Sequence, residues 1–140
     1  MNSRKLTIAE HLFTQTYPAL DDPKILISVL QNLHGAIEDA ITEKLEHARE
    51  NKHIPAYSTT FNGKVTAFKI HLARDLKINP VDFMMIGELQ ELLQQQKQAP
   101  TEFRRKTDFI IADNDFHLHQ ISPEKTKTYI ERTKSFVSRL

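Results

Sequence analysis

The chain has 140 residues, of which 39% are hydrophobic and 26% are charged, and this suits a single domain (1–140) with one buried core. Its 19 basic and 18 acidic residues leave a formal charge of +1, which excludes a global attraction to nucleic acid or to anionic lipid. The lack of cysteine excludes a disulfide framework, a thiolate zinc site and a cysteine nucleophile.

The first half of the sequence predicts two helices. A short amphipathic segment over about 7–16 ends at Pro18, which interrupts a helix because it has no N–H. Apolar residues then recur at steps of three and four and predict one long helix over about 22–52. Asp22 is its expected N-cap and Pro23 its first helical residue.

The second half predicts three more helices and a hairpin. Helical periodicity and capping residues indicate helices over about 60–75, 80–98 and 123–140. Between the last two, an apolar run, a turn cluster and an alternating run predict a small β-hairpin over about 109–121. The expected fold is therefore mainly α, a four- or five-helix bundle around the long helix with the hairpin before the last helix.

Two features bear on location. No window approaches the ~18 apolar residues that a membrane span requires, so we expect no membrane partner. The N-terminal residues have no long apolar run and no small-residue cleavage site, and the lack of cysteine fits a reducing compartment. We therefore expect a cytoplasmic protein.

Positive charge is concentrated beyond residue 97. Residues 97–140 hold nine basic and six acidic residues, whereas residues 21–53 hold four basic and seven acidic ones. A compact cluster, Arg104-Arg105-Lys106, precedes the hairpin, and further cations lie on the last helix. These helix cations are Lys125, Lys127, Arg132, Lys134 and Arg139. Such residues bind phosphates, so we predict a non-catalytic binding protein whose partner is nucleic acid or an acidic protein.

The seven histidines are candidate metal ligands. On the long helix, Glu43, His47 and Glu50 share a face. Bundle metal sites need Glu-x-x-His on two helices, and the one such pair around a histidine is Glu50 and His53, at the helix end. His117 and His119 share one face of the predicted second strand, with the nearest carboxylates on the preceding turn. Two ligands do not make a zinc site, so the sequence predicts no metal and no cofactor.

Two resemblances add expectations. The segments TYPALDDPKILISVLQNLHGAIEDAI and APTEFRRKTDFIIADNDFHLHQISPEKTKTYIERTKSFV resemble a family of small, uncharacterised archaeal helical proteins, which implies a fold but no activity. The chain also resembles the HEPN class of helical bundles, some of which are metal-independent ribonucleases with an Arg-x4–6-His motif. Arg4 and His11 have this spacing, which implies them as catalytic residues. In active members the motif lies on a late helix, and the residue after the arginine is not a lysine such as Lys5.

Other enzyme signatures are missing, because three glycines supply neither a phosphate-binding loop nor a nucleophile elbow. A non-catalytic role is therefore the first hypothesis and a HEPN-type ribonuclease the second. A third hypothesis is a structural homodimer, since a long helix can offer leftover apolar surface to a second copy.

Overall fold

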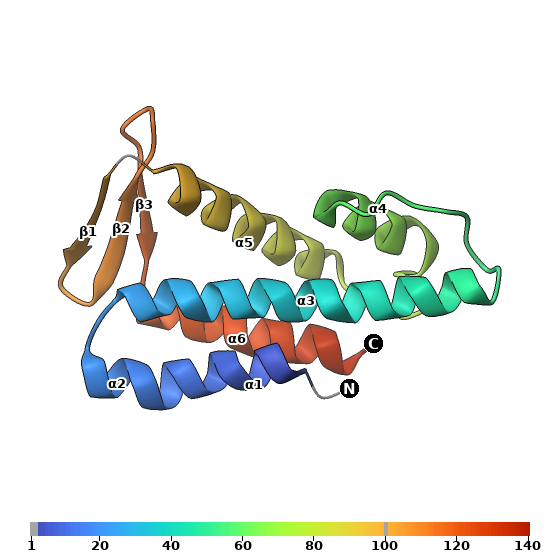
Figure 1. Cartoon of the computed structure of the whole chain (residues 1–140), viewed down its shortest axis with the longest axis horizontal. Helices are drawn as coiled ribbons and strands as arrows, with labels where there is room; N and C mark the ends of the chain where they lie inside the picture. Colours follow the sequence, from blue (N-terminus) through green and yellow to red (C-terminus); the bar gives the residue numbers. More distant parts are fainter. Residues whose placement is uncertain (1–2, 100) are drawn as a thin grey trace.

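The computed structural model describes residues 3–99 and 101–140, and this part of the chain is mainly helical with a small antiparallel sheet before the last helix. The predicted fold class is thus confirmed. Figure 1 shows the long helix in the middle, with the other helices along it and the sheet at one end. In chain order the elements are α1 Arg4–His11, the π-helical turn η1 Leu12–Thr16, α2 Tyr17–Leu20, α3 Lys24–Glu50, α4 Phe61–His71, α5 Pro80–Gln98, β1 Thr101–Arg105, β2 Asp108–Ala112, β3 Leu118–Ile121 and α6 Pro123–Ser138.

The N-terminal helix continues through Pro18, so the prediction that it ends there was wrong. Because Pro18 has no N–H, the carbonyl of Thr14 loses its usual donor four residues ahead. The chain responds with the wider π-helical turn, in which the N–H of Tyr17 bonds to the carbonyl of Leu12, five residues back. The helix then stops at Leu20, where Asp21 takes a left-handed conformation with φ of 49°.

Helix α3 begins and ends close to the predicted bounds. The Asp22 carboxylate accepts a 3.0 Å hydrogen bond from the N–H of Lys24, next to Pro23. The helix has 27 residues, a length of about 40 Å, and ends at Glu50, two residues before the predicted end. In spite of this length, neither α3 nor any other helix of the described residues is apolar enough over 18 residues to cross a membrane.

The core is organised along α3, which packs against α1, α4, α5 and α6. Its largest apolar side chains are inaccessible to solvent and join a hydrophobic core that extends to every neighbouring helix. These side chains are Leu26, Leu30, Leu33, Ile37, Ile41 and Leu45. Small residues of α3, such as Ala36 and Ala40, are also fully buried, so the helix is covered on more than one side.

Capping side chains fix where the later helices start. Thr60 accepts a hydrogen bond from the N–H of Gly63, Asn79 from that of Val81, and Ser122 from that of Lys125. These residues satisfy backbone donors that have no partner in the first turn. The Asn-Pro and Ser-Pro pairs that predicted the last two helices are both confirmed as caps followed by a proline in the first turn.

The sheet has three strands in the order β1-β2-β3, both pairs antiparallel. The predicted hairpin corresponds to β2 and β3, and β1 was not predicted. All five residues of β1 are exposed, so the segment has no alternation of buried and exposed positions that would reveal a strand. Lys106, in the turn between β1 and β2, has a left-handed conformation with φ of 56°.

The central packing of α3 makes a testable prediction. Leu33→Ala removes a fully buried side chain and leaves a cavity, so the free energy of unfolding should fall by about 2–5 kcal/mol. Leu20→Ala makes the same change at a side chain that is 66% exposed, and it should alter the free energy of unfolding by no more than ~0.5 kcal/mol. Urea unfolding followed by circular dichroism measures both, and equal losses would contradict a core centred on α3.

Candidate functional site

Cross-strand pairing divides the side chains of the sheet between two faces. Phe103 pairs with Ile110, which pairs in turn with Gln120, and side chains alternate along each strand. One face therefore carries this row and the two rows beside it. We call it the outer sheet face, and it consists of Thr101, Phe103, Arg105, Asp108, Ile110, Ala112, Leu118 and Gln120.

The opposite, inner face attaches the sheet to the helices. Phe109, Ile111 and Ile121 are each no more than 3% exposed and belong to the hydrophobic core. Their burial explains the period-two pattern that predicted β3. The alternation along β3 follows the period-two pattern: Ile121 and His119 lie on the buried face, whereas Leu118 and Gln120 lie on the exposed face.

Arg104 joins the sheet to the start of the long helix. Its guanidinium donates to the backbone carbonyl of Asp21 at 3.0 Å and to the Asp21 carboxylate at 3.2 Å. Its Nε also donates to the carbonyl of Lys106 at 2.7 Å, which fixes the turn between β1 and β2. Within the predicted basic cluster, Arg104 therefore has a structural role.

Apolar side chains remain exposed on the outer sheet face. Phe103 is 37% exposed and Leu118 is 54% exposed, while Ile110 between their strands is only 2% exposed. Gln120 lies beside Ile110, and its side-chain amide donates to the Asp108 carboxylate. Phe116, in the loop just before β3, is 84% exposed. The outer sheet face thus presents one exposed aromatic ring, Phe103, beside the buried Ile110, and Phe116 lies in the turn between β2 and β3.

Positive charge lies next to the ring of Phe103. Arg105 belongs to the outer sheet face two residues from Phe103, and Lys106 follows in the turn. Both side chains are exposed, and among the described residues neither forms an ion pair, in contrast to Arg104. Two cations and an aromatic ring are therefore available on one edge of the sheet.

The predicted cations of α6 lie on two flanks of the helix. Residues seven apart share a flank, and residues two apart lie on roughly opposite flanks. Lys125 and Arg132 line a groove beside α5. Lys127 and Lys134 belong to the other flank, where Lys134 pairs with Glu10 at 3.4 Å. These four cations therefore do not share one flank of α6.

Arg4 and His11, the candidate catalytic pair, both lie on α1. They are seven positions apart, with six residues between them, so they occupy one flank of the helix two turns apart, and both are exposed. Neither lines any of the cavities described here. Within residues 3–99 and 101–140, the geometry therefore gives no support to a site around the pair, and their catalytic role stays a prediction.

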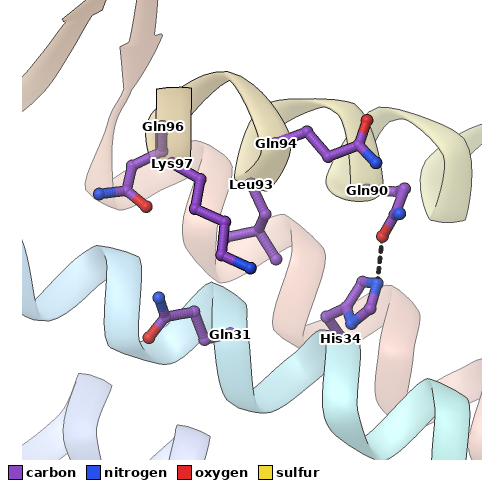
Figure 2. Close-up of a pocket in the computed structure, with 7 residues that line it drawn as sticks. All are labelled: Gln31, His34, Gln90, Leu93, Gln94, Gln96 and Lys97. Atoms are coloured by element: carbon purple, nitrogen blue, oxygen red, sulfur yellow. Dashed lines mark hydrogen bonds between the residues drawn. The ribbon is translucent and has the colours of Figure 1, made fainter. Parts of the chain in front are cut away.

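A cavity that the sequence did not reveal lies between α3 and α5. Its volume is about 330 Å³, and Figure 2 shows its lining with side-chain amides from both helices. The lining residues are Gln31, His34, Gln90, Leu93, Gln94, Gln96 and Lys97. Side-chain amides of this kind can hydrogen-bond neutral polar groups. Apart from His34, Lys97 is the one ionisable residue of the lining.

His34 is the titratable group of this cavity. Its ring stacks on Phe61 with centroids 4.1 Å apart, and its Nε2 is hydrogen-bonded to the side chain of Gln90. Burial lowers the pKa of His34, and the opposing effect of the Gln90 hydrogen bond is smaller. The lowered pKa favours the neutral imidazole, which packs against Phe61 and is hydrogen-bonded to Gln90.

The turn between β2 and β3 gathers carboxylates and imidazoles. One oxygen of Asp113 accepts the backbone N–H groups of Asp115 and His117, each at 2.9 Å. Its other oxygen accepts a hydrogen bond from Nε2 of His119 at 2.8 Å. The His119 hydrogen bond and the two backbone donors lower the pKa of Asp113. The predicted histidine pair thus shares one ionised carboxylate.

Comparison with known proteins adds no assignment to this geometry. No protein-family model, no curated protein and no solved structure matches the chain. The archaeal family and HEPN resemblances therefore remain predictions.

The environment of His34 makes a testable prediction about pH. Because its pKa is lowered in the folded state, the unfolded chain binds more protons as the pH falls through about 6.5, so stability decreases there. His34→Gln keeps a hydrogen-bonding partner for Gln90 and should reduce the loss of unfolding free energy between pH 8 and pH 5. A midpoint for His34 at or above ~6.5 in an NMR titration would refute this assignment.

Proposed function

We propose that the chain is a non-catalytic, cytoplasmic protein that binds single-stranded nucleic acid through its outer sheet face. The observation that carries the proposal is the exposed ring of Phe103, which lies beside Arg105 on a face whose centre, Ile110, is packed and buried. This proposal keeps the predicted binding through the basic cluster. It assigns the binding surface to the sheet and leaves out the cations of α6.

The chemistry of single strands fits this surface. Unpaired bases stack on exposed aromatic rings whatever their sequence, and nearby cations contact the phosphates. Phe103 supplies such a ring, and Arg105 and Lys106 supply the two cations. A duplex would use the cations alone, because its bases are already stacked.

Other surfaces support the proposal less well. The cations on α6 lie on separate flanks, and Lys134 is neutralised by Glu10. Homodimerisation through the open edge of the sheet is disfavoured by Glu102, Arg104 and Arg105 on β1, since charges on an edge strand oppose pairing with another strand.

The proposal predicts salt-dependent binding to a single-stranded oligonucleotide, measured by fluorescence anisotropy with oligouridine and oligothymidine. Phe103→Ala should weaken binding about 5- to 150-fold, which corresponds to the ~1–3 kcal/mol of one stacked base. Arg105→Ala should weaken it less and reduce the slope of log K against log salt by about 0.7, the value for one phosphate contact of a single strand.

Matched variants on α6 provide the control. Arg132→Ala removes the same kind of side chain as Arg105→Ala and should leave both affinity and salt slope unchanged. Absence of binding to either oligonucleotide, or equal effects of the two arginine variants, would overturn the proposal. Binding to polyglutamate in place of both oligonucleotides would assign the surface to an acidic protein partner.

A further inference from the structure

We propose that the turn between β2 and β3 is a binding site for a divalent transition metal of the zinc type, with Asp113, Asp115 and His117 as ligands. This site is independent of the nucleic-acid proposal. One donor atom from each of the three side chains lies within 4.8 Å of the others. A zinc ion with bonds of about 2.0–2.1 Å separates its ligand atoms by roughly 3.4 Å, so small side-chain rotations suffice.

The local sequence explains why these groups meet. Potential ligands occupy every second position from 113 to 119, and the chain between β2 and β3 reverses direction there. Asp113 holds the reversal together, because its Oδ1 accepts two backbone N–H groups of the turn. Its second oxygen, Oδ2, is thereby directed toward His117, whose Nδ1 lies 3.8 Å away. The backbone therefore fixes one ligand in place.

His119 is positioned to orient the ligand Asp113 and is not itself one of the three ligands. Its Nε2 donates to Oδ2 of Asp113 at 2.8 Å, and its side chain is 32% exposed. Metal ligands are commonly oriented by such a hydrogen bond from a neighbouring group. Both imidazoles of the predicted histidine pair then have a role, one as a ligand and one as the partner of a ligand.

The choice of metal follows from the donor atoms. An imidazole nitrogen favours zinc, nickel, cobalt or copper over magnesium and calcium, which prefer sites of oxygen alone. Access is open, since the His117 side chain is 78% exposed, whereas that of Asp113 is 12% exposed. With three protein ligands, a fourth position remains for water or for an external ligand.

Isothermal titration with zinc chloride alone should give one ion per chain, and excess magnesium should not displace it. His117→Ala and Asp115→Asn change exposed ligands and should each reduce the affinity at least ~10-fold. His53→Ala removes an exposed histidine elsewhere and should have no effect. Asp113 is left intact in these variants because its loss would also break the turn.

Cobalt binding distinguishes coordination of the ion by these side chains from nonspecific electrostatic attraction of the ion to the carboxylates. The cobalt complex of the wild type should show visible absorption bands of a low-coordinate site, and His117→Ala should abolish them. His119→Gln keeps an N–H donor for Asp113 and should leave the shape of the spectrum unchanged. Failure of the wild type to bind zinc, or an equal loss in His53→Ala and His117→Ala, would overturn the site.

Discussion

Burial of the apolar side chains of α3 is the constraint on which the rest of the structure depends. A helix of 27 residues with fully buried leucines and isoleucines along its length is longer than a single short neighbour can cover. Helices α1, α4, α5 and α6 therefore pack along it. In Figure 1 these helices follow α3 from one end to the other, and the sheet lies at the end where α3 begins.

The sheet is attached to this helical core, and the attachment uses only one of its two faces. Three core residues of its inner face and the Arg104–Asp21 ion pair attach it near the start of α3. Because this attachment uses one face, the other face can carry the exposed ring of Phe103 and the cation of Arg105 without loss of core packing. At the β2–β3 turn, one carboxylate oxygen of Asp113 accepts backbone N–H groups of the turn and the other accepts a hydrogen bond from His119.

The sequence predicted the helices well because each has a periodic apolar face and a capping residue, as at Asn79 and Ser122. It failed at Pro18, where a π-helical turn absorbs the missing N–H, and at β1, whose side chains are all exposed. The charge pattern of the sequence located the basic cluster. Only the pairing of β1 with β2 shows that Phe103 and Arg105 lie on one face of the sheet and Arg104 on the other. The cavity at His34 joins residues of α3 and α5 that are far apart in sequence, so no local pattern reveals it.

The central claim is that the outer sheet face binds a partner that the helices do not contact. Its most direct test is a map of backbone amide chemical shifts on addition of a single-stranded oligonucleotide. The account predicts that the changes are concentrated in β1, the turn at Lys106 and β3, with the α6 residues Lys127 and Arg132 unaffected. Changes concentrated on α6 or around the His34 cavity, with β1 unaffected, would contradict it.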